Sequence, residues 1–288
     1  MVKAERSLNP RRKGRQNRHI IKNKIIIPLI IILTVISLSL GITLSLGDDG
    51  SQNNYKVVKV LVYSGNDTSE NSINQIKKCM DQANSKNLVP GVKFVYDTSK
   101  IINNQTLSGY DVLIMAGSET GFNCINNDDV NVADLKSFVA SGKGFMGICA
   151  GAYSAAEYTD NWYYGWGLAP NVVNLPYVDV GNVTIQTTSS GTEIMGGTDR
   201  WISPINGPAM YSTDYSTVTF ATYADCNSSY KGYAAIIGDH YGEGRIVLSS
   251  VHPELSSPPA DVLVNLIMWV YNGSYINDTN GTDTNAYT

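Results

Sequence analysis

Short apolar runs alternate with amphipathic segments over the region that follows residue 55. Four runs rich in Val, Ile, Leu and Met predict strands, and the first of them shows the scarcity of polar alternation that is typical of a parallel strand buried on both faces of a sheet. They are residues 57–63, 92–96, 111–116 and 144–148. Between them, residues 70–83 and 132–140 have the apolar spacing of helices. Strands that alternate with helices predict a doubly wound, mainly parallel α/β sheet.

The pattern changes after residue 160, where shorter segments replace the long apolar runs. Strands are predicted at 171–176, 183–187, 218–223, 233–237 and 244–251, followed by a closing helix at 259–271. Residues 238–244 (GDHYGEG) predict a turn that contains His240. We therefore expect an antiparallel extension of the parallel sheet. An aromatic cluster at 161–166 either lines a substrate cleft or, more simply, covers the rim of the sheet.

The start of the chain has the pattern of a membrane anchor. Residues 1–24 carry nine Lys and Arg against one acid, Glu5, and residues 25–46 form a run of 22 residues without a charge. A run of this length can span a membrane as a helix. The basic segment favours a cytoplasmic N-terminus, which predicts a single-pass signal anchor with the main domain outside the cytoplasm. A cleaved signal peptide is the alternative.

These features divide the chain into five parts. They are a basic cytoplasmic tail (1–24), a transmembrane signal anchor (25–46), a polar linker (47–55), one α/β domain (56–273) and a polar tail rich in Asn, Thr and Asp (274–288). The tail has little to bury and is predicted to be disordered. The roughly 220 residues of the domain are enough for one complete hydrophobic core.

The charge and the sequons of the exposed region indicate its environment. Without the basic tail, 21 − 9 = 12 basic residues remain against 25 − 1 = 24 acidic ones, a net charge near −12. This acidity argues against nucleic-acid or anionic-lipid binding. Seven Asn-x-Ser/Thr sequons on the predicted outer side indicate a glycosylated, extracellular protein. They start at Asn66, Asn104, Asn182, Asn227, Asn272, Asn277 and Asn280.

The most specific stretch for chemistry surrounds Cys149. The apolar run 144–148 stops at this cysteine, which lies between Gly147 and Gly151 and precedes a helix-forming run of Ala and Ser. The pattern predicts a strand, a sharp turn and a helix, with the cysteine at the apex in a strained conformation. The helix N-terminus would favour a thiolate, and the Ala150 N–H would point toward an oxyanion. A buried structural cysteine in a Gly-rich turn is the alternative.

A base and an acid for this nucleophile are predicted about a hundred residues later. The strand at 244–251 ends in His252-Pro253-Glu254, which places a histidine and a carboxylate at the sheet edge. The chain has three histidines, and His19 lies in the basic tail. His252 is therefore the well-placed partner for Cys149. In a doubly wound sheet the loops 64–69, 117–121 and 149–151 should meet at the same crevice.

Together these motifs resemble class I glutamine amidotransferase-like domains, in which an elbow cysteine is followed late in the chain by His-Pro-Glu. More narrowly, residues 63–69 (YSGNDTS), 149–153 (CAGAY) and the Gly-rich strand before His252 are similar to the domain at the N-terminus of biotin–protein ligases. The resemblance covers about residues 56–272. It implies a flavodoxin-like sheet and a catalytic triad of Cys149, His252 and Glu254.

The same resemblance implies further site residues. Related amidotransferases carry a glycine pair that supplies the second oxyanion-hole N–H, and here Gly117 and Ser118 occupy that place, opposite the elbow that supplies the Ala150 N–H. Ser118 replaces the second glycine, which changes the expected orientation of the donor. Tyr63, Asn66 and Tyr153 lie in the matching motifs and are predicted to contact substrate.

Two classes of function fit these expectations. The first is a cysteine-dependent amidase that hydrolyses a small-molecule or peptide amide, since no synthase domain that could receive ammonia is apparent. The second is a non-catalytic surface module that keeps the fold to bind a partner of unknown identity. An α/β-hydrolase is disfavoured, because its acid normally precedes the histidine at a distance along the chain. No ligase catalytic domain is apparent either.

The remaining cysteines and motifs suggest no prosthetic group. Cys79 falls on the apolar face of the helix at 70–83 and is predicted to be a core residue, whereas Cys124 and Cys226 are the better candidates for a disulfide. Their connectivity is left open by the sequence. No Cys/His spacing typical of a metal site and no phosphate-binding glycine motif is apparent, so we expect neither a metal nor a cofactor.

Overall fold

The computed structural model describes residues 55–119, 128–176, 181–195, 199–202, 207–224, 230–255 and 259–273. The chain divides into two units, residues 1–52 and 53–288, and every described residue belongs to the second. The predicted membrane segment 25–46, the tail 274–288, Cys124 and Cys226 lie outside the described residues. Within the described ranges, no helix is both long and apolar enough to cross a membrane.

The predicted parallel sheet is confirmed. Its strands are β2 (Val92–Ser99), β1 (Lys56–Tyr63), β3 (Val112–Met115), β4 (Gly144–Ile148) and β13 (Gly244–Ser249), in this spatial order. All neighbours in this series pair in parallel. This 2-1-3-4-5 arrangement is the flavodoxin-like order, in which the crevice lies where β1 and β3 diverge. Burial differs from the prediction at the start of β1, where Lys56 and Val57 are exposed.

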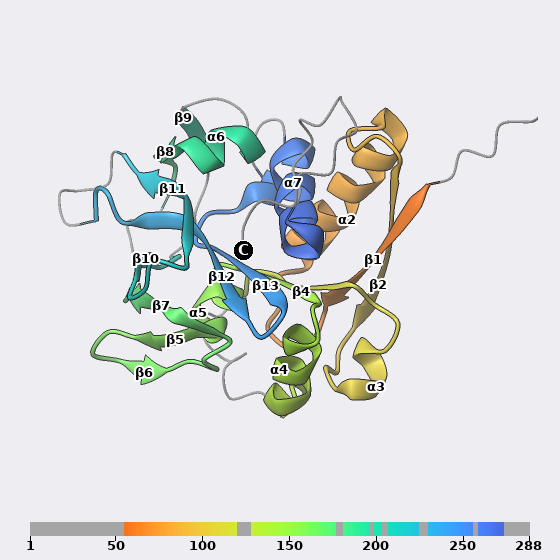
Figure 1. Cartoon of the computed structure of the whole chain (residues 1–288), viewed down its shortest axis with the longest axis horizontal. Coiled ribbons are helices and arrows are strands. Elements are labelled where there is room, and N and C mark those ends of the chain that lie inside the picture. Colours follow the sequence, from red (N-terminus) through yellow and green to blue (C-terminus); the bar gives the residue numbers. More distant parts are fainter. Residues whose placement is uncertain are drawn as a thin grey trace, which may run out of the picture. The chain divides into compact units, whose positions relative to one another are not determined.

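Helices cover both faces of the sheet (Figure 1). One face packs against α2 (Glu70–Lys86) and α7 (Pro259–Asn272), whose apolar residues join Val60, Ile114 and Met146 in one cluster. The other packs against α3 (Asn104–Leu107), α4 (Val132–Ala140) and α5 (Ala150–Ala155), around Leu113 and Phe145. The doubly wound arrangement follows from this division, because each strand sends successive side chains to opposite faces.

The antiparallel extension begins at β12 (Ala234–Tyr241), which pairs antiparallel with β13. Beyond β12 the sheet continues through four strands and a branch. The continuation is β10 (Ala209–Ser212), β7 (Ala169–Leu175), β5 (Ala156–Thr159) and β6 (Tyr163–Tyr164). The branch is β11 (Val218–Tyr223), β8 (Val183–Thr187) and β9 (Asp199–Ile202), with α6 (Ser189–Met195) beside it. Only β5 and β7 depart from the antiparallel pattern, among the described pairings of this extension.

The predicted turn around His240 is wrong. Strand β12 runs on through His240 to Tyr241, which pairs with Gly244, so the turn consists of Gly242 and Glu243. Gly242 has a φ of +59°, as a tight hairpin turn requires. Asp239 stabilises the longer strand, because its buried carboxylate accepts hydrogen bonds from the Asn171 backbone and side chain. The apparent turn residues are therefore strand residues with side-chain partners.

The aromatic cluster at 161–166 divides between core and surface. Trp166 is buried against the cluster around Phe145, whereas Trp162 is half exposed and Tyr164 is 80% exposed.

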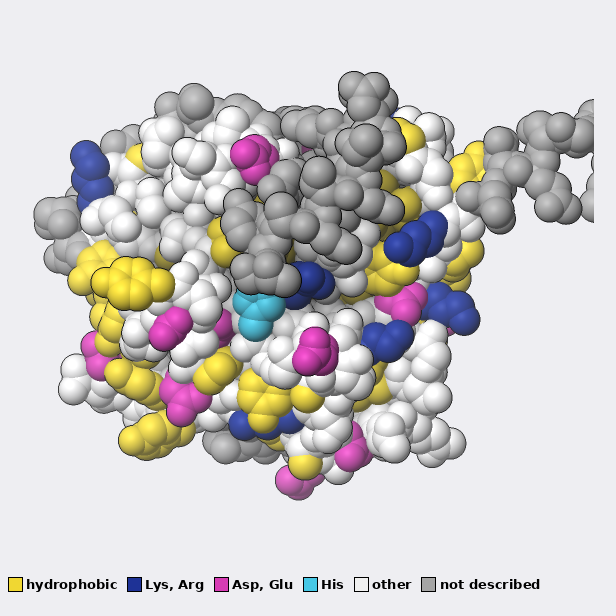
Figure 2. All heavy atoms as spheres, in the orientation of Figure 1, with side chains coloured by type: hydrophobic (Ala, Val, Ile, Leu, Met, Phe, Trp, Pro, Cys, Tyr) yellow, Lys and Arg dark blue, Asp and Glu magenta, His cyan; other side chains and the backbone are white. Residues whose placement is uncertain are grey.

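On the face shown in Figure 2, the described Lys and Arg side chains lie interspersed with Asp and Glu. The described part of that face thus has no extended surface of one charge.

Candidate active site

Cys149 occupies the predicted elbow between β4 and α5. Its backbone has a φ of 53° and a ψ of −104°, a conformation that a non-glycine residue adopts only under constraint. Its N–H donates to the Ser249 carbonyl at 2.8 Å, which fastens the elbow to the neighbouring strand β13. The predicted strain is confirmed, and Cys149 begins a helix whose six residues are all buried.

The two glycines around Cys149 are required by close backbone packing. A Cβ atom on Gly147 would lie 2.6 Å from the Gly151 carbonyl carbon and oxygen, and one on Gly151 would lie 2.4 Å from the Met115 carbonyl oxygen. Both distances are far below a van der Waals contact. The elbow can therefore form only with glycine at both positions, which confirms the steric reason inferred from the Gly-x-Cys-x-Gly spacing.

His252 and Glu254 lie at the end of the adjacent strand. Strand β13 is the parallel neighbour of β4, so the chain segments after both strands leave the sheet at one edge. Glu254 belongs to the short helix η2 (Pro253–Leu255), and its Oε1 lies 2.8 Å from His252 Nδ1. The two side chains are almost completely buried. The structure thus brings together the predicted base and acid.

The imidazole of His252 lies close to Cys149. A Cβ atom on Gly117 would be 2.8 Å from His252 Cε1 and 3.7 Å from Cys149 Cβ, so Gly117 packs against both residues. Burial by itself lowers the pKa of His252, but the Glu254 carboxylate and the Cys149 side chain raise it to about 10. Buried Nε2 makes no regular hydrogen bond to a described residue. A near but imperfect Cys–His contact is common in sites without substrate.

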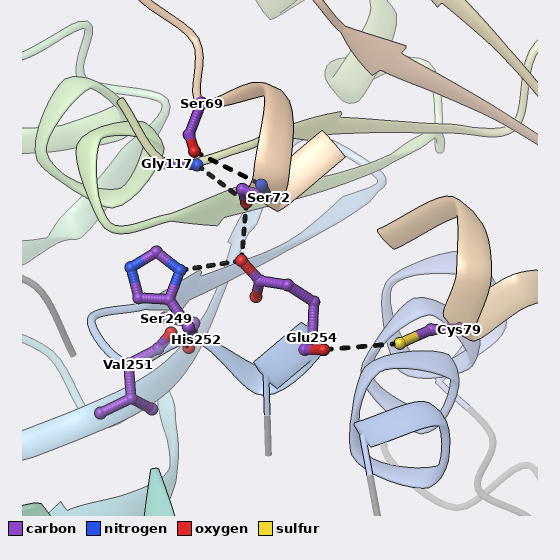
Figure 3. A network of polar contacts seen from close by, with 8 residues as sticks. All are labelled: Ser69, Ser72, Cys79, Gly117, Ser249, Val251, His252 and Glu254. Carbon is purple, nitrogen blue, oxygen red and sulfur yellow. Dashed lines mark hydrogen bonds and ion pairs between the residues drawn. The ribbon is translucent and has the colours of Figure 1, made fainter. Parts of the chain in front are cut away.

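The Glu254 carboxylate accepts a second hydrogen bond, from a residue that the sequence-based prediction missed. Ser72 Oγ donates to Glu254 Oε1 at 2.6 Å, so His252 and Ser72 share one carboxylate oxygen. Figure 3 shows the carboxylate between the imidazole and the start of α2. From the same helix, Cys79 Sγ contacts the Glu254 carbonyl at 3.8 Å. The buried Cys79 is thus a core residue, as predicted, and also supports Glu254.

A sequence signal for Ser72 exists. The buried face of α2 includes Ile76, Cys79 and Ala83, and Ser72 continues this stripe one turn toward the N-terminus. A hydroxyl on a buried helical face needs a hydrogen-bond partner, which Glu254 supplies. The partner itself could not be read from the sequence, because 182 residues separate the two.

The predicted oxyanion hole is only partly compatible with the structure. The Gly117 N–H donates to Ser72 Oγ at 3.4 Å, and the Gly117 carbonyl accepts a hydrogen bond from Ser69 N. The Gly117 N–H is therefore directed at Ser72 and not at a substrate on Cys149. Ser118 forms an isolated bridge with Thr68. The bonds of that bridge run from Ser69 N to Gly117 O and from Glu119 N to Asp67 O. This pattern turns the Ser118 N–H away from the Thr68 segment.

The same bridge confirms that the loops after β1 and β3 meet. Of the predicted substrate-contacting residues, Asn66 is exposed in the first loop, whereas Tyr63 is buried and its hydroxyl lies against Gly65. The Tyr153 hydroxyl donates to the Pro176 carbonyl. Burial and then the nearby Tyr163 and Cys149 raise the pKa of Tyr153. The surroundings of Tyr153 therefore include Cys149.

A further tyrosine supports the segment that carries His252. The hydroxyl of Tyr223, from β11, bonds to Ser250 Oγ and contacts the Pro208 carbonyl at 3.2 Å. Ser249 Oγ donates to the Val251 carbonyl at 2.7 Å. These bonds fix the backbone that leads from β13 to His252, and they tie it to the antiparallel extension.

No group of three or more metal-ligating side chains occurs among the residues that the structure describes. A cavity of about 430 Å³ lies beside the paired strands β8 and β11. Its lining includes Thr184, Gln186, Thr222 and Lys231.

Comparison with known proteins supports the predicted resemblance. Residues 58–162 match the family described as "Biotin-protein ligase, N terminal", a segment that includes Cys149 but not His252 or Glu254. Comparison with curated proteins finds no significant match. A ThuA-like protein from Bacteroides uniformis shares the fold at 13% identity and a TM-score of 0.51, over 78% of this chain and 95% of that one.

Two further solved structures align at lower scores. A GMP synthase-like protein from Thermoplasma acidophilum has 15% identity and a TM-score of 0.49, over 74% of this chain and 94% of that one. A glutamine amidotransferase has 16% identity and a TM-score of 0.47, over 72% and 97%. Residues 58–162 are thus similar to the N-terminal domain family of biotin–protein ligases, and the solved structures show a likeness of fold alone.

Proposed function

We propose that this protein is a cysteine-dependent amidase that acts on a glutamine-like or peptide amide. The observation that carries the proposal is the juxtaposition of the strained Cys149 with the buried His252–Glu254 pair at the ends of two neighbouring parallel strands. This arrangement supplies a nucleophile, a proton carrier and a group that orients it. The match over residues 58–162 is consistent with the elbow but does not define a substrate.

In the proposed reaction, the Cys149 thiolate attacks the amide carbon and the carbonyl oxygen becomes an oxyanion. The N–H groups of Ala150 and Ser118 are the proposed donors to that oxyanion. Collapse breaks the C–N bond, and the proton held by His252 goes to the leaving nitrogen, which departs as ammonia or an amine. A water molecule then gives its proton to His252 and attacks the thioester. The C–S bond then breaks and releases a carboxylic acid. The sulfur leaves as the thiolate and His252 keeps the proton taken from water, which restores the starting pair.

Glu254 has a distinct task in this scheme. Its carboxylate fixes the imidazole through Nδ1 and raises the pKa of His252, so that the imidazole holds a proton to deliver to the leaving nitrogen. The raised pKa also favours an imidazolium beside Cys149, which would stabilise a thiolate.

The decisive experiment is covalent labelling with a chloroketone analogue of glutamine. We expect site-resolved mass spectrometry to find the label on Cys149, with protection by millimolar glutamine or by a glutamine-containing peptide. His252→Gln should slow labelling by more than about tenfold, because the imidazole then no longer assists the thiol. Equal rates at Cys149 in the wild type and His252→Gln would reject the proposal.

The second candidate function is a binding module without catalysis. The observation that favours it is burial: Cys149 is 7% exposed and His252 is 4% exposed. A site that admits an amide must uncover the thiol. In the labelling experiment, a Cys149 that reacts no faster than the buried Cys79 would support the binding module.

We further propose that the domain is anchored outside the cytoplasm as a glycoprotein. The support comes from the uncharged run 25–46, the preceding basic residues and the seven sequons. Protease added to intact cells should cleave the domain. Complete protection of the domain would contradict this topology.

A further inference from the structure

We infer that Ser72 is a positioning residue of the candidate active site, which holds the Glu254 carboxylate against His252 and connects it to the loop that follows β3. The inference rests on the proposed cysteine chemistry but concerns a residue outside the Cys–His–Glu motif. It adds a fourth side chain, supplied by α2, to the groups that shape the reaction.

The contacts place Ser72 between two parts of the site. Its hydroxyl donates to Glu254 Oε1 at 2.6 Å and accepts from the Gly117 N–H at 3.4 Å. Gly117 in turn packs against the His252 ring. One hydroxyl therefore links the acid with the backbone that seats the imidazole (Figure 3).

The position of Ser72 on its helix fixes the hydroxyl. Ser72 is the third residue of α2, in the first turn of the helix, and it lies on the buried face. Ser72 is buried, with 3% of the residue exposed, so water does not readily replace its hydroxyl. Further along the same face of α2, Cys79 contacts the Glu254 carbonyl. Helix α2 therefore holds the Glu254 carboxylate through Ser72 and the Glu254 backbone through Cys79.

The Ser72 hydroxyl affects the proton on His252 because both groups bond to the same oxygen of the Glu254 carboxylate. Both hydrogen bonds to the carboxylate use Oε1, while the buried Oε2 has no hydrogen-bond partner in the described part of the chain. Without Ser72, the carboxylate would keep one bond and could turn toward other partners. Glu254 would then stabilise the imidazolium less well.

The other titratable groups near the His252–Glu254 pair come from the elbow and from α2. Cys149 approaches His252 from the elbow, and Cys79 faces Glu254 from α2. The charge of the neighbouring Lys78 also acts on Cys79. These groups remain in place when Ser72 is replaced, so a change in pH dependence would report the lost hydroxyl.

The test is the pH profile of Cys149 alkylation by iodoacetamide in the full chain, resolved by mass spectrometry from the other cysteines. We expect Ser72→Ala to slow alkylation at pH 7 by roughly ten- to a hundredfold, because a displaced catalytic pair loses its alignment. The midpoint of the profile should move about 1 pH unit upward, since less imidazolium is available to stabilise the thiolate. Ser72→Thr keeps the hydroxyl, so its alkylation rate and the midpoint of its pH profile should both lie close to those of the wild type.

Ser69→Ala is the matched control. It removes the N-cap side chain from the same helix but leaves the Ser72–Glu254 bond, so it should lower the melting temperature without moving the midpoint. If Ser69→Ala moved the midpoint as far as Ser72→Ala, or if Ser72→Ala left it unchanged, the inference would be overturned.

A spectroscopic measurement separates this inference from the proposed catalysis. The proton between His252 Nδ1 and Glu254 should give a strongly downfield proton NMR signal, which Ser72→Ala should shift or broaden. That change would support the role of Ser72 even if Cys149 proved unreactive. An unaltered signal together with a slow, His252-independent Cys149 would overturn both proposals, whereas an unaltered signal with a His252-dependent Cys149 would overturn the inference alone.

Discussion

Cys149 and the His252–Glu254 pair lie at the ends of neighbouring parallel strands, but the fold holds them by different means. The cysteine is fixed by backbone packing, since Gly147 and Gly151 leave no space for a side chain. The acid–base pair is fixed by side-chain hydrogen bonds that arrive from α2. The packing constraint between Gly147 and Gly151 is local in sequence, whereas the hydrogen bonds that reach Glu254 from α2 join residues far apart. The first kind of support can therefore be read as a motif and the second cannot.

The largest effect should come from filling the elbow. Gly151→Ala places a methyl group 2.4 Å from the Met115 carbonyl oxygen, a contact that backbone atoms cannot relieve without moving β3 or α5. We expect a loss of about 3 kcal/mol in the free energy of unfolding, measured with urea.

Gly109→Ala is the control for this substitution. Gly109 has a φ of +87° and nothing within 4 Å of a Cβ atom, so alanine there adds strain without a clash. Its cost should be about 1–2 kcal/mol. Equal losses in the two variants would show that backbone conformation, and not packing, holds the elbow.

Breaking the acid–base pair should have a smaller effect on stability. Glu254→Gln keeps the shape of the side chain and an oxygen for Ser72, but it removes the negative charge beside the buried imidazole. We expect a loss of about 2 kcal/mol, since His252 can release its proton and avoid a buried unpaired charge. Labelling of Cys149 should nevertheless slow markedly. A variant with normal labelling would separate Glu254 from the chemistry.

The extent to which sequence predicts the structure follows the same division. Strands β4, β8 and β11 and helix α4 begin and end at the predicted residues, because their apolar patterns are uninterrupted. The predicted strand ends before Gly238, because the residue types Gly, Asp and His that follow are common in turns. The hydrogen bond from Asn171 to Asp239, which stabilises the longer strand, cannot be read from the sequence. The resemblance assigns Gly117 to an oxyanion hole, but its N–H bonds to Ser72. No local pattern indicates that contact.

The contribution of His252 to the free energy of unfolding should depend on pH. The pKa of folded His252 is raised above the ordinary value, so its contribution is fully present below about pH 6.5 and declines as the pH rises toward the folded value of about 10. We expect the deficit of His252→Gln, relative to the wild type, to be larger at pH 6 than at pH 10 by at least about 1.4 kcal/mol. Urea unfolding at both values measures it. A deficit that grows with pH would mean that His252 is buried as the neutral form.

The smallest effect is expected at Asn66, which lies in the loop between β1 and α2. This loop joins the segment after β3 through the Thr68–Ser118 bridge and the bond from Glu119 N to the Asp67 carbonyl. A glycan on Asn66 would stand beside the segment that carries Ser118. We therefore expect Asn66 to be unmodified in the native protein, and Asn66→Gln to change the rate of Cys149 labelling by less than about twofold, as for an exposed residue outside the triad.

Asn104 provides the comparison for Asn66, because it is also an exposed residue in a sequon. It is the first residue of α3, and its backbone N–H donates a hydrogen bond to the Asp134 carboxylate. Mass spectrometry of glycopeptides from the native protein reads both positions in one sample. Occupancy at Asn104 with none at Asn66 would fit a crevice that must stay accessible for an amide substrate. Full occupancy at Asn66 would place a bulky sugar at the loop that meets Gly117 and Ser118, and it would favour the binding module over the amidase.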